Sequence, residues 1–76
     1  MHIQIEVRLF ATLRQGRFRR KTLLVPLDST IAELCRVLGI IDGEAVILLV
    51  NGAATRQDHQ LASGDEVALF PAIGGG

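Results

Sequence analysis

The sequence predicts an α+β fold in which a mixed β-sheet packs on one main helix. Three observations predict it: polar and apolar residues alternate along residues 3–9, Thr30 and Glu33 match a helix-start pattern, and residues 45–50 are continuously apolar. Alternation indicates a strand with one buried face, and a short apolar run is typical of a strand that is covered on both sides or central in a sheet. The chain has 76 residues, of which 49% are hydrophobic, so it has room for one domain with a core.

The first part of the chain is expected to form two strands joined by a loop. Residues 3–9 are the first strand, and residues 11–20, which include Gly16, break the alternation and predict a loop with room for a helical turn. Residues 21–27 are the second strand, and Pro26 predicts that it lies at a sheet edge, since proline has no N–H for a ladder. The residues predicted on its buried face are Leu23, Val25 and Leu27.

The main helix is predicted to begin after Asp28-Ser29-Thr30. Thr30 and Glu33 fit a capping box, in which each side chain accepts a hydrogen bond from the other residue's backbone N–H. Gly39 is expected in the last turn or just past it. The side chains at helical spacing on the predicted core face are Ile31, Leu34, Cys35, Leu38 and Ile41.

The remainder of the chain is expected to form three strands separated by turns. Asn51-Gly52 is a strong signal for a hairpin turn, and Pro71 is expected to end the last strand. The predicted segments are strand 45–50, short strand 53–56, loop 57–62, turn 63–65 and strand 66–70. The order strand, strand, helix, strand, short strand, strand is that of a β-grasp fold.

Composition excludes several classes of function. Eight basic and eight acidic residues balance, so no overall field favours nucleic acid or an anionic membrane, and no run approaches the roughly 20 apolar residues of a membrane span. Cys35, His2 and His59 lack the spacing of metal ligands, so we expect no metal site. We expect a cytoplasmic protein with a buried, inert Cys35, surface histidines and an exposed apolar patch that binds a partner.

The C-terminal tail is the main candidate for chemistry. We expect a folded domain over residues 1–71 and a flexible tail over 72–76, which ends in Gly74-Gly75-Gly76. A frayed chain end is the structural alternative. Glycine lacks a Cβ, however, so such a tail can thread a narrow channel, and five residues reach about 17 Å at about 3.3 Å each. A carboxylate must be activated before a nucleophile attacks it, and no phosphate-binding loop or Ser/His/Asp set is evident, so a partner must supply that chemistry.

Two segments carry a resemblance to a known family. Residues 7–14 read VRLFATLR and resemble the N-terminal segment of the small subunit of molybdopterin synthase. Residues 64–71 read GDEVALFP and, with the terminal Gly75-Gly76, resemble the family's C-terminal signature. The turn at residues 50–52 also fits. The chain therefore resembles the ubiquitin-like sulfur carriers.

The resemblance implies a mechanism and its partners. An E1-like enzyme would use ATP to adenylate Gly76, and a sulfur donor would convert it to a thiocarboxylate. The large synthase subunit would then use that sulfur to build the dithiolene of molybdopterin or its tungsten form. The chain itself would bind no cofactor. The residues implied in this role are Gly76 as the reactive terminus, Gly74 and Gly75 in tail threading, and Phe70, Pro71 and Ile73 in partner contact.

The sequence departs from the family at two tail positions. The family commonly has a second proline where this chain has Ala72, and a non-glycine residue where it has Gly74. Both differences loosen the tail and leave its terminal carboxyl unchanged. The alternatives are a protein modifier joined to lysines through Gly76, a thiamine-type carrier, and an interaction module with an inert tail. Thiamine-type carriers are usually shorter and lack the FATLR segment, so they rank lower.

The remaining open questions concern a basic segment and two phenylalanines. The basic segment is either a solvated loop or a docking patch for an acidic partner, and RNA ranks below both because only Phe18 is interleaved. Phe10 and Phe70 are out of phase with the buried residues of their strands, so they either cap the core edge or are exposed. We expect Phe70 to be exposed beside the tail. The basic residues are Arg14, Arg17, Arg19, Arg20 and Lys21.

Overall fold

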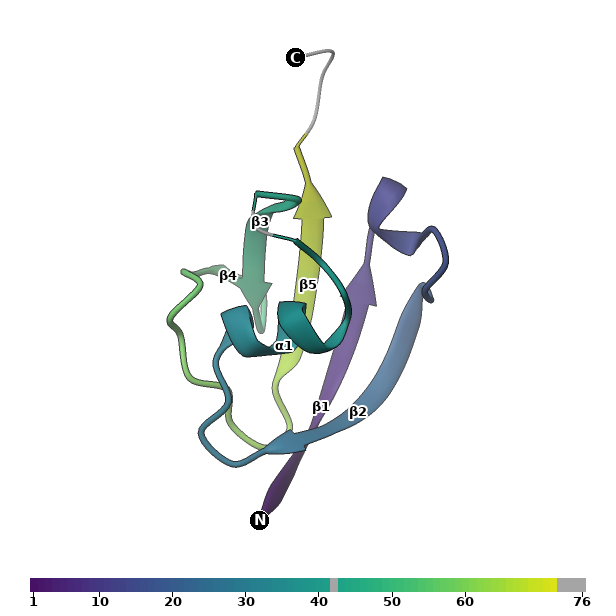
Figure 1. The fold of residues 1–76 in the computed structure, drawn as a ribbon. Helices are drawn as coiled ribbons and strands as arrows, with labels where there is room; N and C mark the ends of the chain where they lie inside the picture. Colours follow the sequence, from purple (N-terminus) through teal and green to yellow (C-terminus); the bar gives the residue numbers. More distant parts are fainter. Residues whose placement is uncertain (42, 73–76) are drawn as a thin grey trace.

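A computed structural model of the protein describes residues 1–41 and 43–72. It shows one mixed sheet with a single helix across one face, as the sequence predicts (Figure 1). The strand order is β2-β1-β5-β3-β4, in which β1 and β5 run parallel and the other neighbours are antiparallel. The strands are β1 (His2–Leu9), β2 (Arg20–Pro26), β3 (Ala45–Val50), β4 (Ala53–Ala54) and β5 (Glu66–Pro71).

The predicted capping box forms at the start of α1 (Ile31–Val37). Thr30 Oγ1 accepts a hydrogen bond from the Glu33 N–H, and Glu33 Oε1 accepts one from the Thr30 N–H. The helix ends before Gly39, whose φ of 75° turns the chain away from the helical path. This turn buries Ile40 and leaves Ile41 73% exposed. The prediction that Ile41 lies on the buried helix face is therefore wrong, because the helix ends before it.

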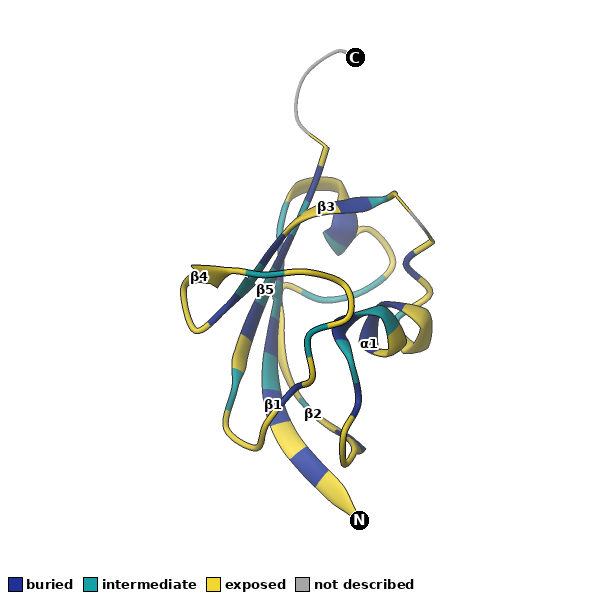
Figure 2. Cartoon of the chain, turned by 90° about the vertical axis from the view of Figure 1, so that its left-hand side faces the viewer, coloured by how far each residue is buried: buried dark blue, intermediate teal, exposed yellow. Residues whose placement is uncertain are grey.

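The core lies between α1 and the face of the sheet that it covers. Along β1 the odd-numbered side chains are buried, which confirms the strand predicted from alternation (Figure 2). Val25 of β2 is buried as predicted, whereas Leu23 is half-buried. Leu27 was predicted to be buried and is instead exposed. Leu27 lies beyond the end of β2, where its N–H donates to the carbonyl of Met1. Met1 is itself exposed, so the Leu27 side chain lies at the edge of the core and not inside it.

Strand β3 has one of the two environments that its apolar run predicted. It lies inside the sheet between β5 and β4, but only one of its faces is covered. A β-bulge between Ala45 and Ile47 leaves Val46 56% exposed and Ile47 41% exposed. Of the two environments that the apolar run predicted, the structure confirms a position inside the sheet and not cover on both faces. Strand β4 is also shorter than the predicted segment 53–56.

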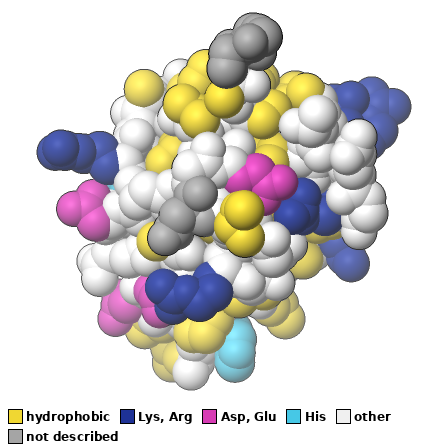
Figure 3. Space-filling view, turned by 45° about the horizontal axis from the view of Figure 1, so that its top comes forward, with side chains coloured by type: hydrophobic (Ala, Val, Ile, Leu, Met, Phe, Trp, Pro, Cys, Tyr) yellow, Lys and Arg dark blue, Asp and Glu magenta, His cyan; other side chains and the backbone are white. Residues whose placement is uncertain are grey.

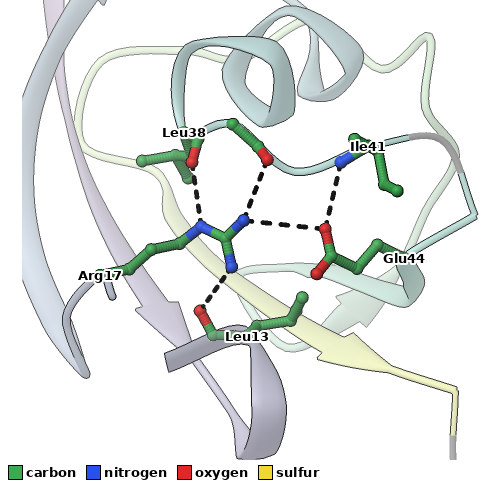
Figure 4. Close-up of polar contacts among 6 residues, drawn as sticks. Leu13, Arg17, Leu38, Ile41 and Glu44 are labelled. Atoms are coloured by element: carbon green, nitrogen blue, oxygen red, sulfur yellow. Dashed lines mark hydrogen bonds and ion pairs between the residues drawn. The ribbon is translucent and has the colours of Figure 1, made fainter. Parts of the chain in front are cut away.

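Arg17 joins the loop after β1 to the end of α1 (Figure 4). That loop contains the short 3₁₀-helix η1 (Ala11–Arg14), the helical turn for which the sequence left room. Arg17 donates to three carbonyl oxygens: Nε to Leu38 at 2.9 Å, Nη1 to Leu13 at 3.0 Å and Nη2 to Gly39 at 3.0 Å. Cations at helix C-termini compensate carbonyls that lack helical partners. Arg17 is thus a structural residue and not a solvated charge of the basic segment.

Candidate functional site

The tail leaves the domain at the end of β5. Because β5 is parallel to β1, the C-terminal ends of both strands lie at the same end of the sheet (Figure 1). Pro71, the last residue of β5, is buried, and Ala72 is exposed. Ile73, Gly74, Gly75 and Gly76 lie outside the described residues, so their predicted roles stay predictions.

Phe10 and Phe70 form a stacked aromatic pair beside the start of the tail. Leu9 of β1 pairs with Leu69 of β5, and the Phe10 N–H donates to the Leu69 carbonyl at 3.2 Å. The residue that follows each leucine is a phenylalanine: Phe10, just past the end of β1, and Phe70 on β5. The ring centroids are 4.1 Å apart, with the ring planes 7° from parallel. Both side chains are half-buried, so Phe70 is partly exposed beside the tail.

An apolar patch extends from this pair over the uncovered face of the sheet. Phe70 pairs with Ile47 of β3, and Ala68 pairs with Leu49. These side chains lie opposite the buried residues of their strands and are exposed or half-buried. Hydrophobic side chains are visible at the end of the molecule where the described chain stops (Figure 3). We name the set the open-face patch: Phe10, Ile47, Leu49, Ala68 and Phe70.

Two arginines lie against the outer side of Phe10. The guanidinium carbons of Arg8 and Arg14 are 5.7 Å and 5.4 Å from the centre of the Phe10 ring, within the range of cation–π attraction. Arg14 Nε also donates to the Leu9 carbonyl at 2.8 Å, which fixes its orientation. Together with Arg19 and Arg20, they surround a shallow hollow of about 230 Å³.

Charged residues cover the part of the same face over β1 and β2. Arg20 Nε donates a hydrogen bond to Glu6 Oε2, and an Arg8 nitrogen lies 3.7 Å from a Glu66 oxygen. The hydrogen bond from Arg20 lowers the pKa of the Glu6 carboxyl below its ordinary value of 4.5, and the positive charges of Arg20 and Arg8 add to this. The uncovered face therefore has an apolar half over β5 and β3 and a charged half over β1 and β2.

Part of this site is predictable from the sequence. Phe70 was identified from its register, and the tail from its glycines. Ile47 and Leu49 were missed because they belong to a continuous apolar run, which does not show which of its residues face the uncovered side of the sheet. The stacking of Phe10 on Phe70 could have been found, since each directly follows a buried leucine on strands that a β-grasp fold makes parallel neighbours.

The other candidate residues lie away from the tail. Cys35 is buried on α1 as expected. His2 is exposed, and His59 is half-buried instead of fully at the surface. Over residues 1–41 and 43–72, no cluster of three or more His, Cys, Asp or Glu side chains is placed to hold a metal ion. Within the same residues, no helix is long and apolar enough to cross a membrane.

Comparison with known proteins identifies the family. The sequence pattern of the ThiS family matches residues 7–76, which is most of the chain and includes the glycine tail. The chain belongs to the ThiS family. This membership confirms the predicted resemblance to the ubiquitin-like sulfur carriers. No curated protein sequence matches the chain.

Solved structures confirm the β-grasp fold of this ThiS-family chain. SAMP1 from Haloferax volcanii is 28% identical with a TM-score of 0.73, over 96% of this chain and 99% of that one. A second match is to subunit 1 in a complex of subunits 1 and 2 of molybdopterin-converting factor from Helicobacter pylori. It is 20% identical with a TM-score of 0.59, over 97% of this chain and 100% of that one. The ubiquitin of Caldiarchaeum subterraneum is 19% identical with a TM-score of 0.64, over the whole of both chains.

Proposed function

We propose that this protein is the small, sulfur-carrying subunit of a cytoplasmic molybdopterin synthase and carries sulfur on Gly76. The observation that supports this most strongly is the match to the ThiS family, which extends to the last glycine. The carrier supplies an acyl group and a shape that other enzymes recognise. It therefore needs no catalytic side chain of its own.

The proposed chemistry takes place on the terminal carboxylate. In the active site of an E1-like enzyme, a carboxylate oxygen of Gly76 attacks the α-phosphorus of ATP, and pyrophosphate leaves. The resulting acyl-adenylate is a good electrophile, because AMP is a far better leaving group than an oxide. Hydrosulfide supplied by a sulfur donor then attacks the carbonyl carbon of Gly76. The C–S bond forms as the C–O bond to AMP breaks, AMP leaves, and loss of the S–H proton gives the thiocarboxylate. The large synthase subunit receives this tail and transfers the sulfur to the cofactor precursor.

We propose that the open-face patch docks both partners and positions the tail. Phe10 and Phe70 are stacked at the end of the sheet where Ala72 leaves β5, so a partner that covers them lies next to the tail. Aromatic side chains dominate the binding energy of many interfaces. The complex of subunits 1 and 2 from Helicobacter pylori supports a large-subunit partner for a protein of this fold.

A reconstituted activation assay tests the proposal. The chain is incubated with an E1-like enzyme and labelled ATP, and the acyl-adenylate is measured. We expect adenylation of the full chain and none after removal of Gly75 and Gly76. A thiocarboxylated chain should then restore molybdopterin formation by the large subunit. Adenylation of the truncated chain would refute the proposal, whereas sulfur transfer to a thiazole precursor alone would favour the thiamine-type carrier.

One observation favours a second candidate function. SAMP1 from Haloferax volcanii, a small archaeal modifier protein, is 28% identical to this chain. A modifier would use the same adenylate but would transfer Gly76 to lysine side chains. Mass spectrometry of proteins from the native host distinguishes the two, because a modifier leaves conjugated lysines that carry the tail glycines.

A further inference from the structure

The structure divides the positive charges of the basic segment into two groups. Arg17 binds carbonyl oxygens at the end of α1, and Lys21 Nζ lies 5.9 Å from the centre of the Phe18 ring. The remaining arginines, together with one from β1, line the shallow hollow of about 230 Å³ beside Phe10. Four guanidinium groups at one hollow repel one another unless anions lie between them. We name these residues the arginine cluster: Arg8, Arg14, Arg19 and Arg20.

Two members of the arginine cluster are matched by acidic residues of the chain. Arg8 and Arg20 are directly opposite each other in the register of β1 and β2, a position at which like charges repel. Arg20 donates a hydrogen bond to Glu6, and an Arg8 nitrogen lies 3.7 Å from a Glu66 oxygen. The charges of Arg8 and Arg20 are therefore balanced within the fold.

Arg14 and Arg19 are not matched in this way. Neither of them forms an ion pair with a residue that the structure describes. The hydrogen bond from Arg14 to the Leu9 carbonyl keeps its guanidinium carbon 5.4 Å from the centre of the Phe10 ring. Arg19 is exposed and lines the same hollow. The hollow therefore keeps an excess of positive charge next to an aromatic ring of the open-face patch.

A protein that covers the open-face patch must also cover part of this hollow, because Phe10 belongs to both. Covering Arg14 removes its charge from water, which costs free energy unless an anion replaces the lost hydration. A carboxylate can do so, since it accepts two parallel hydrogen bonds from one guanidinium. A partner with apolar or basic side chains at this position would therefore bind poorly.

We propose that the arginine cluster binds two acidic side chains of the protein that docks on the open-face patch, one at Arg14 and one at Arg19. This inference rests on the proposed function and adds a specificity requirement to it. Opposite charges steer the encounter of two proteins, and like charges exclude wrong partners. RNA fits less well, because Phe10 is already stacked on Phe70 and no second aromatic ring of the described chain lines the hollow.

Binding of the full-length chain to the E1-like enzyme of the native host tests this proposal. Surface plasmon resonance measures the affinity and the association rate at physiological and at high salt. We expect Arg19→Glu to weaken the affinity at least about tenfold at physiological salt, mainly through slower association, because it replaces an attraction by a repulsion. The loss should shrink at high salt, which screens exposed charges. Arg19→Gln should bind with an intermediate affinity, and Arg14→Gln should also bind more weakly than the unmodified chain.

Arg56→Glu is the matched control, because it changes the net charge of the chain by the same amount. Like Arg19, Arg56 is exposed and forms no ion pair with the described residues. It follows β4, at the opposite edge of the sheet from β2, and does not line the hollow. Charges beyond about 8 Å are largely screened at physiological salt, so Arg56→Glu should weaken the affinity less than about twofold.

Two results would overturn this inference alone. Equal affinities of Arg19→Glu and Arg56→Glu for the enzyme would show that the hollow meets no acidic side chain. Tighter binding of a short single-stranded RNA than of the enzyme, lost in Arg19→Glu and kept in Arg56→Glu, would assign the hollow to nucleic acid. Removal of Gly75 and Gly76 tests the proposed function separately. The truncated chain should lose adenylation and keep the difference between the two variants, whereas failure of the unmodified chain to bind the enzyme would overturn both proposals.

Discussion

At the scale of single residues, the pair Phe10 and Phe70 links the fold to the proposed function. The two rings are stacked at a centroid distance of 4.1 Å, and neither is fully buried. Their contact is possible because parallel strands β1 and β5 place them next to each other after Leu9 and Leu69. This half-buried aromatic pair stabilises the end of the sheet and leaves apolar surface exposed beside Ala72.

Replacing Phe70 by alanine should weaken partner binding without unfolding the domain. The stacking contributes about 0.5–1.5 kcal/mol beyond burial, so the domain should remain folded. Binding of the E1-like enzyme or the large subunit, measured by calorimetry, should fall at least tenfold if Phe70 is an anchor. Leu69→Ala is the control, because Leu69 is fully buried and its loss should cost about 2–5 kcal/mol of stability. Unfolding of Phe70→Ala would instead indicate a core role.

The Glu6 carboxyl should titrate below its ordinary pKa. Arg20 donates to the ionised form and thereby lowers the pKa in the folded state. Because the folded pKa lies below the unfolded one, this contribution to stability is present above about pH 4.5 and is lost as the pH falls through the folded value. Carboxyl-detected NMR titration should show the lowered pKa, and Arg20→Gln should raise it. A pKa that is the same in both proteins would contradict this.

At the scale of elements, the ends of α1 are fixed by two different polar devices. The capping box of Thr30 and Glu33 starts it, and the guanidinium of Arg17 binds carbonyls at its end. The first is local in sequence, so the pattern Thr-x-x-Glu predicted it. The second is not local, because Leu38 and Gly39 lie 21 and 22 positions after Arg17 in the sequence. Nothing in the basic segment distinguishes Arg17 from the arginines around it.

Arg17→Met should destabilise the domain while Arg19→Met should not. Arg17→Met removes three hydrogen bonds to carbonyl oxygens. A hydrogen bond with a charged donor contributes about 1.5–3 kcal/mol to stability, less where water can replace it. We expect a loss of about 2 kcal/mol, because water can reach some of these carbonyls. Arg19 is exposed, and its side chain forms no hydrogen bond or ion pair with the described residues, so its replacement should change stability by less than about 0.5 kcal/mol. Urea unfolding of both variants measures the difference, and equal midpoints would refute the role of Arg17.

At the scale of the whole molecule, the local patterns of the sequence predicted the elements, and tertiary features decided their surroundings. Alternation in β1 and the proline of β2 were sufficient for a half-buried strand and an edge strand. The apolar run of β3 was misleading, because some of its residues face the core and others belong to the open-face patch. No residue in the run indicates the β-bulge near Val46. Ile41 and Leu27 were misplaced because each lies just beyond the end of its element.

The site divides in the same way between local and tertiary information. The glycine tail is visible in the sequence because no folded element needs three consecutive glycines at a chain end. The open-face patch is not, because its members come from three segments that only the strand order brings together. The proposed function needs both parts, because the terminus would carry the sulfur and the patch would deliver it to a partner.

The intact mass of the protein purified from its native host tests the central claim most directly. If Gly76 carries sulfur, a fraction of the chain should be heavier than its sequence by the difference between one sulfur and one oxygen, and fragmentation should place the increase on the last residue. Alkylation of the folded protein should shift only that fraction, because Cys35 is buried. Alkylation of the unfolded protein should add one group to every chain at Cys35 and a second group to that fraction. A chain that never shows the increase, even when the E1-like enzyme and the sulfur donor are overproduced, would contradict the account.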